Sequence, residues 1–207
     1  MSTTALPLLD SAIRGLVDEK LTALEQHLDC DVAFYYGQIH EGYLRIFRDF
    51  VEQLRSDAQH SGIALFLNTP GGSVEAAEKM VDVLRHHYPD QVSFVVPDAA
   101  MSAGTILCMS GDRIYMDYSS SLGPIDPQVF NGREWVPALG YLDQVERMLE
   151  KDSQGKLTNA EILLLRQLDL ALLRRFEQAR ELTIDLLKRW LVQYKFCSVE
   201  RLAGWPG

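Results

Sequence analysis

The sequence predicts an α/β domain with a mostly parallel sheet, followed by a region made almost wholly of helices. Between residues 31 and 116, short β-rich or apolar runs alternate with amphipathic stretches, a pattern typical of a parallel sheet covered by helices. After Pro137 the sequence changes to helical periodicity. We therefore expect an N-terminal helix at 1–28, an α/β core at 29–137, and a helical C-terminal region at 138–207 in the same domain.

The first half of the chain supplies the expected strands. Leucine and isoleucine recur every three to five positions over 8–28, which predicts an amphipathic helix. The continuous apolar run at 63–67 is typical of a buried parallel strand. By the same reasoning we predict strands at 31–36, 92–96 and 113–116, helices at 43–54 and 74–87, and a small-residue apolar segment at 99–109.

The second half supplies a loop and then helices. Residues 119–127 are rich in turn formers, which predicts a loop. Helical patterns then cover 139–151, 159–173 and 174–196, with one clear interruption at 152–155. The broad apolar face of the last helix suits core packing or a subunit interface.

Composition excludes several function classes. The 207 residues carry a formal net charge of −9, which argues against nucleic acid as a partner. The three cysteines have no zinc-ligand spacing, and no metal or cofactor is implied. No signal peptide and no apolar window of membrane-spanning length are present, so we expect no transmembrane segment and a cytoplasmic location.

Two glycines follow the buried strand at 63–67 and precede the helix at 74–87. Gly71 and Gly72 can adopt backbone angles closed to other residues and let a substrate approach the main chain. Their N–H groups lie near a helix N-terminus, which suits a phosphate or a developing oxyanion. No Gly-Lys-Ser/Thr follows, so the turn is not a P-loop. Alone, it is equally explained as a tight strand-to-helix connection.

A serine occupies the turn after the next strand. Ser102 stands among alanines and a glycine at the start of an apolar helix, which is a position typical of an exposed nucleophile. The N–H of Ala103 would then be a second oxyanion donor. Alone, Ser102 is equally explained as a helix N-cap. Together the two turns indicate a functional site more strongly than either does alone. One helix and one strand separate them, which places both at the carboxyl ends of the strands of a parallel sheet.

These motifs carry a family resemblance. The runs at 68–73, 101–104, 111–113 and 122–127 resemble the Clp-protease/crotonase superfamily, and within it the serine dehydrogenase proteinase group, relatives of signal peptide peptidase A. The resemblance implies a ββα-spiral core with C-terminal helices and Ser102 as nucleophile. It implies an oxyanion hole formed by Gly71 or Gly72 together with Ala103, peptide or protein substrates, and a homo-oligomer.

The general base is the open question. The Clp-type histidine would fall at Pro124, and all five histidines precede Ser102, so the resemblance favours a Ser-Lys pair as in signal peptide peptidase A. The candidates are Lys151, in a run that fits the closer group, and Lys156, which opens a run similar to the start of the lysine-bearing helix in archaeal relatives. A lysine in either position is more often a solvated surface residue. Asp126 is a candidate orienter of a base or substrate, or simply part of an Asp-Pro turn.

The sequence therefore predicts a serine hydrolase, in particular an intracellular serine endopeptidase that needs no ATP by itself. Two alternatives stay open. An acyl-coenzyme A enzyme of the crotonase type would use the same oxyanion hole without a serine nucleophile. A catalytically silent scaffold would keep the fold and assemble with a partner, which the missing base favours.

Overall fold

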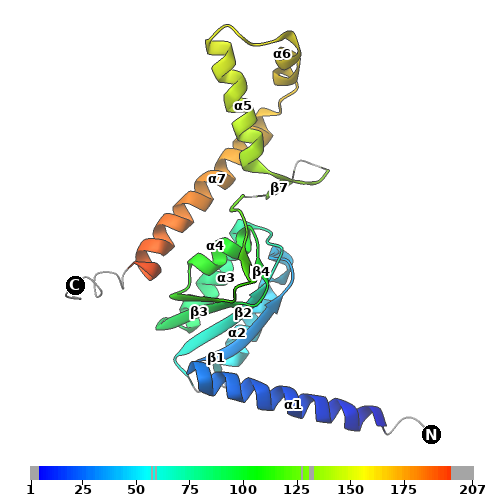
Figure 1. Cartoon of the computed structure of the whole chain (residues 1–207), viewed down its shortest axis with the longest axis vertical. Coiled ribbons are helices and arrows are strands. Elements are labelled where there is room, and N and C mark those ends of the chain that lie inside the picture. Colours follow the sequence, from blue (N-terminus) through cyan, green and yellow to red (C-terminus); the bar gives the residue numbers. More distant parts are fainter. Residues whose placement is uncertain (1–4, 57, 59, 127, 131–132, 197–207) are drawn as a thin grey trace, which may run out of the picture.

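The structure is a computed structural model that describes residues 5–56, 58, 60–126, 128–130 and 133–196. A four-stranded, fully parallel sheet with strand order β1-β2-β3-β5 forms its centre (Figure 1). The strands are β1 (Asp31–Tyr36), β2 (Gly62–Asn68), β3 (Gln91–Val96) and β5 (Arg113–Met116). All four match the runs predicted as strands to within one residue at each end.

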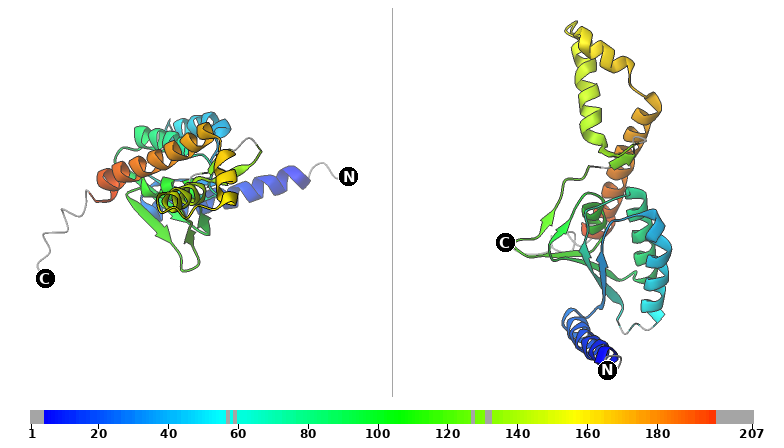
Figure 2. Two further views of the ribbon diagram at one scale, coloured as in Figure 1. Left: turned by 90° about the horizontal axis from the view of Figure 1, so that it is seen from above. Right: turned by 90° about the vertical axis from the view of Figure 1, so that its right-hand side faces the viewer.

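Helices cover both faces of this sheet. The helices α2 (Leu44–Ser56) and α3 (Val74–His87) lie side by side on one face (Figure 2). Their apolar side chains join inward-facing strand residues in the main core. On the other face, the C-terminal half of α1 (Ala5–Leu28) packs on β1 and β2 through Leu21, Leu24 and Leu28. The alternation within β1 explains the division, because Ala33 faces the main core and Val32 faces α1.

A second, smaller sheet lies at the carboxyl ends of the central strands. It contains β4 (Ala99–Ala100) and β6 (Ser121–Leu122), which pair in parallel. The chain after β2 joins it, since Thr69 forms a bridge with Ala100 and Gly72 forms a bridge with Ile39. The short α4 (Ala103–Met109) follows β4. Residues 119–127 were predicted as a loop, so β6 was missed; two residues are too short for a period-2 pattern.

The C-terminal helices form an arm that rises from the core (Figure 1). A hairpin of β7 (Gln128–Phe130) and β8 (Trp135–Pro137) leads into α5 (Ala138–Ser153), α6 (Asn159–Arg166) and α7 (Leu170–Trp190). α5 packs on the first half of α7 around Leu142 and Phe176. We use "arm" for residues 138–180. The second half of α7 and a π-helical turn, Leu191–Lys195, return to the core, where Leu186 and Trp190 are buried.

The arm corrects one sequence expectation. A single helix was predicted over 159–173, but the structure ends α6 at Arg166 and begins α7 at Leu170. Asp169 explains the break, because its carboxylate accepts hydrogen bonds from the main-chain N–H groups of Ala171 and Leu172 and so caps a new helix.

Candidate functional site

Ser102 occupies a sharp turn between β4 and α4. Its backbone has φ 51° and ψ −116°, which lies in the region that favours glycine and costs a non-glycine residue about 1–3 kcal/mol. Main-chain bonds hold the turn in place: Gly104 N donates to Met101 O over 2.8 Å, and Ile106 N donates to Ser102 O over 3.2 Å. The turn therefore presents the half-buried Ser102 side chain at the edge of the sheet instead of capping α4 with it.

The two glycines pack directly against this turn. Both have positive φ, 98° at Gly71 and 147° at Gly72. A Cβ added to Gly71 would lie 2.8 Å from Ser102 Cβ and 2.6 Å from Met101 O, and one added to Gly72 would lie 1.9 Å from Ile39 O. No side chain fits at either position, so the structure brings the Gly-Gly turn and the serine turn into contact.

The amides of the two glycines point in different directions. Gly71 N donates to Thr69 Oγ1 over 3.0 Å. The Gly71 carbonyl accepts from Ile39 N over 2.9 Å, and this carbonyl shares a planar trans peptide with the N–H of Gly72. The two groups of a trans peptide point in opposite directions. The Gly72 N–H therefore points away from Ile39 N, on the opposite side of this peptide from the Gly71 carbonyl.

A second main-chain donor lies beside Ser102 in sequence. Ala103 is the first residue of α4, and the first N–H groups of a helix have no acceptor within the helix. The N–H groups of Gly72 and Ala103 thus belong to the two turns that meet at Ser102.

The loop after β6 closes the other side of the turn. Ser102 Oγ donates to the main-chain carbonyl of Asp126 over 3.1 Å, while Asp126 Oδ1 accepts from Leu139 N over 3.0 Å at the start of α5. Asp126 therefore contacts the serine through its backbone and the arm through its carboxylate. Thr105 Oγ1 contacts the carbonyls of Ala100 and Gly123 over 2.7 and 3.1 Å, which ties the loop to α4.

The two candidate lysines lie on the arm, away from Ser102 within one copy of the chain. Lys151 is in the last turn of α5, and Lys156 follows in the connection to α6, at the end of the arm remote from the sheet (Figure 1). Lys151 Nζ pairs with Glu161 Oε1 over 2.6 Å, and Lys156 Nζ donates to Gln154 Oε1 over 3.0 Å. The Lys151 ammonium is the largest cause that lowers the pKa of Glu161, to about 2.

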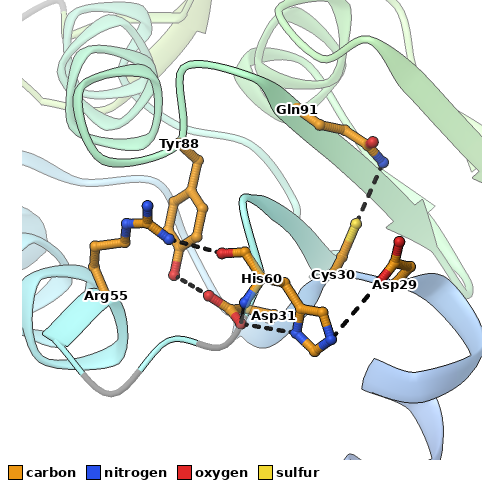
Figure 3. A network of polar contacts seen from close by, with 7 residues as sticks. All are labelled: Asp29, Cys30, Asp31, Arg55, His60, Tyr88 and Gln91. Atoms are coloured by element: carbon orange, nitrogen blue, oxygen red, sulfur yellow. Dashed lines mark hydrogen bonds and ion pairs between the residues drawn. The ribbon is translucent and has the colours of Figure 1, made fainter.

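A separate polar network, drawn in Figure 3, lies at the amino ends of the central strands. The carboxylate of Asp31, which is 3% exposed, accepts from Tyr88 Oη over 2.8 Å and contacts His60 Nδ1 over 3.2 Å. Arg55 donates to the His60 carbonyl and lies over the Tyr88 ring. Burial and the bond to Asp31 raise the pKa of Tyr88. This network sits where β1 begins and joins elements of the core, far along the strands from Ser102.

In the part of the chain that the structure describes, no three His, Cys, Asp or Glu side chains gather where they could hold a metal ion. Within the same ranges, none of the helices combines the length and the apolar character needed to cross a bilayer.

Sequence comparison identifies relatives over most of the chain. The family model described as ClpP-like SDH-type serine proteinase matches residues 44–201. Two uncharacterized proteins of Methanocaldococcus jannaschii are also similar: MJ0137 is 37% identical over 81 residues, and MJ1495 is 30% identical over 114 residues. These matches cover 39% and 55% of this chain but 28% and 37% of the relatives. The chain thus spans about a third of the length of the curated relatives it matches.

Parts of the chain are also similar to solved structures of proteases. Two are mutants of a membrane-bound stomatin-specific protease, one of them in complex with a substrate peptide, at 23% and 20% identity and TM-scores of 0.44 and 0.43. These matches cover 54% and 59% of this chain, and 55% and 63% of those chains. A third is the ClpP protease catalytic domain from Plasmodium falciparum, at 15% identity and a TM-score of 0.34, covering 39% of this chain and 45% of that one.

Proposed function

Since this chain belongs to the family of ClpP-like SDH-type serine proteinases, we propose that it hydrolyses peptide bonds through an acyl-enzyme on Ser102. The predicted family and the Clp-protease-like α/β fold class are confirmed, and membership of a serine proteinase family supports a peptidase activity. The observation that carries the proposal is the meeting of the strained Ser102 turn with the Gly71-Gly72 turn, whose amides point to different sides.

The proposed chemistry uses three groups of this chain. Ser102 Oγ attacks the carbonyl carbon of the scissile bond and passes its proton to a lysine amine. The oxyanion that forms accepts hydrogen bonds from the N–H groups of Gly72 and Ala103. The C–N bond then breaks, the leaving amine takes the proton, and water hydrolyses the ester to release the second product. We assign the donor to Gly72 and not Gly71, because Gly71 N already donates to Thr69.

The lysine is proposed to come from a second copy of the chain. Lys151 and Lys156 lie at the far end of the arm within one copy, and an extended arm is suited to reach a neighbouring molecule. A homo-oligomer would then complete each site with a Ser-Lys pair. We further propose that this activity is that of an endopeptidase that needs no ATP by itself.

Labelling with a fluorophosphonate probe tests the nucleophile. We expect the intact protein to be labelled and Ser102→Ala to lose the label completely, since the probe bonds to the attacking oxygen. Ser110→Ala is the matched control, because Ser110 lies just past the other end of α4 and its hydroxyl donates only to Leu107 O over 2.7 Å. An unlabelled intact protein would support the silent scaffold, and equal labelling of Ser102→Ala would remove Ser102 from the reaction.

Mixing inactive variants tests the origin of the base. We expect Ser102→Ala to be inactive on fluorescent casein when it is assayed by itself. The variant of whichever lysine is the base, Lys151→Ala or Lys156→Ala, should be inactive in the same assay. Mixed and reassembled, they should regain part of the activity, because one copy supplies the serine and its neighbour the lysine. Lys79→Ala on α3, whose amine pairs with Asp82 over 3.3 Å, should remain active throughout. Full activity in both arm-lysine variants would exclude them as bases.

A further inference from the structure

Thr69 lies between the two turns that form the candidate site. It follows the end of β2 and is 1% exposed. Its main chain pairs with the strand that leads to the serine: Thr69 N donates to Ala99 O over 2.9 Å, and Met101 N donates to Thr69 O over 3.0 Å. Thr69 is therefore the residue through which the Gly-Gly turn and the Ser102 turn are joined.

The hydroxyl of Thr69 controls the first glycine amide. Thr69 Oγ1 accepts the Gly71 N–H over 3.0 Å in a buried setting. Without this acceptor, Gly71 would carry a buried unsatisfied donor, at a cost of about 1–3 kcal/mol. Two successive glycines rotate with little steric resistance, so the turn would relieve that cost by turning its peptide planes. Such rotation would also turn the Gly72 N–H, because it belongs to the next peptide unit along the chain, together with the Gly71 carbonyl.

The methyl group of Thr69 contacts the other turn. A Cβ added to Gly104, in the first turn of α4, would lie 2.3 Å from Thr69 Cγ2. The methyl thus packs directly on the helix that begins beside Ser102. One side chain consequently holds the glycine amide with its oxygen and packs against the serine helix with its carbon.

We propose that Thr69 is a positioning residue for the oxyanion hole. Its hydroxyl accepts the Gly71 N–H while Ile39 N binds the Gly71 carbonyl, and the two bonds together fix the Gly71–Gly72 peptide unit with the Gly72 N–H directed at the Ser102 side. This inference rests on the proposed function, because the direction of the Gly72 amide matters to catalysis only if an oxyanion forms beside Ser102. Thr69 itself touches no reacting atom.

The test compares Thr69→Val, which keeps the shape but removes the acceptor, with Thr69→Ser, which keeps the acceptor. We expect Thr69→Val to lower kcat on a chromogenic ester about tenfold, less than the 10²–10³ that follows loss of an oxyanion donor. It should weaken inhibition by a peptide boronate, a mimic of the tetrahedral intermediate, by a similar factor, with KM within about twofold. Thr69→Ser should keep kcat and boronate affinity near their native values.

A second measurement is independent of activity. Hydrogen exchange followed by NMR should show the Gly71 amide exchanging at least about tenfold faster in Thr69→Val than in the native protein or Thr69→Ser. Thr183→Val is the matched control: Thr183 is 5% exposed, and its hydroxyl donates only to Ala179 O within α7. This control should lower thermal stability without changing kcat, boronate affinity or Gly71 exchange.

The outcomes separate this inference from the proposed function. Unchanged Gly71 exchange in Thr69→Val would overturn the inference whether or not the protein is active. If the native protein is active and Thr69→Val has unchanged kcat and boronate affinity, the inference about Thr69 is overturned and the proposed function stands. Faster Gly71 exchange in a protein whose native form has no turnover and no phosphonate label would overturn the proposed function and, with it, the catalytic role of Thr69.

Discussion

At the scale of single residues, the candidate site depends on positions where no side chain fits. Gly71, Gly72 and Gly104 all lie where an added Cβ would meet another atom at less than 3 Å. Because these three residues have no side chain, the two turns and the first turn of α4 can touch. The site is therefore defined by close main-chain approach as much as by the Ser102 hydroxyl.

Gly104→Ala should destabilise the protein despite the high helix propensity of alanine. Its methyl would lie 2.3 Å from Thr69 Cγ2, and overpacking of this kind costs about 1–3 kcal/mol. Combining it with Thr69→Ser, which removes the opposing methyl, should recover much of the loss in urea unfolding. Gly140→Ala in α5 is the control, because nothing lies within 4 Å of its added Cβ. Additive effects of the two substitutions would contradict the contact.

Sequence reasoning at this scale identified the turns but could not rank the glycines. The spacing predicted that the turn with Gly71 and Gly72 and the turn with Ser102 share one sheet edge, and the structure brings them into contact. Which glycine amide faces the serine depends on the orientation of one peptide plane, and no residue pattern encodes that orientation. Thr69 was not singled out, although a hydroxyl residue two positions before a turn glycine is a known local signal.

At the scale of elements, the arm combines a regular helix pair with a polar tip. Thr158 and Glu161 form a reciprocal capping box at the start of α6, and Lys151 joins it from the end of α5. The tip is thus held by one carboxylate shared among three groups. If Lys151 serves as a base in a neighbouring molecule, it must first leave Glu161.

The carboxyl group of Glu161 should titrate near pH 2. The bond from Lys151 is the main cause of the lowered pKa, followed by the bonds from Thr158. A lowered carboxyl pKa stabilises the folded arm above the ordinary value of 4.5, and this contribution is lost as pH falls toward 2. In carbon-detected NMR, Lys151→Met should raise the midpoint, whereas Lys156→Met should not. An ordinary midpoint in the native protein would contradict the ion pair.

The sequence predicted the helices and strands well where apolar residues follow a single helical or strand periodicity. Strands β1 and β5 and helix α3 have the predicted bounds, because each is a short run with clear punctuation. The break between α6 and α7 was missed because apolar residues continue through it in helical spacing, and only Asp169 marks it. The hairpin β7–β8 was missed because two three-residue strands carry too little periodicity.

At the scale of the whole molecule, the end of α7 fastens the C-terminal region to the core. Arg85 of α3, whose side chain is 10% exposed, pairs with Asp112 over 2.9 Å and donates to the Ser110 carbonyl. Tyr194 covers the guanidinium, with its ring centre 3.7 Å from Arg85 Cζ. Burial lowers the pKa of the neighbouring Lys195. The arm is thus anchored through α7, while its tip extends from the core.

Asp112→Asn should loosen this anchor and lower the free energy of unfolding by about 2 kcal/mol, because it leaves the Arg85 cation without its carboxylate. Asp112 also accepts from Val92 N over 2.8 Å, so part of the loss will come from the sheet. Glu146→Gln is the control: its exposed pair with Arg180 on the arm contributes about 0–1 kcal/mol. Urea unfolding measures both, and equal effects would contradict the anchor.

Asp126 has a consequence for any attempt to trim or divide the chain. Its carbonyl accepts the Ser102 hydroxyl and its carboxylate accepts Leu139 N–H, so one residue contacts both the nucleophile and the first turn of α5. A fragment that stops before Leu139 would take one partner from that carboxylate and disturb the residue on which the nucleophile rests. A useful excision therefore begins farther along α5 and ends before the second half of α7, which packs on the core through Leu186 and Trp190. A swap of arms between relatives should likewise keep the first turn of α5 with its own core.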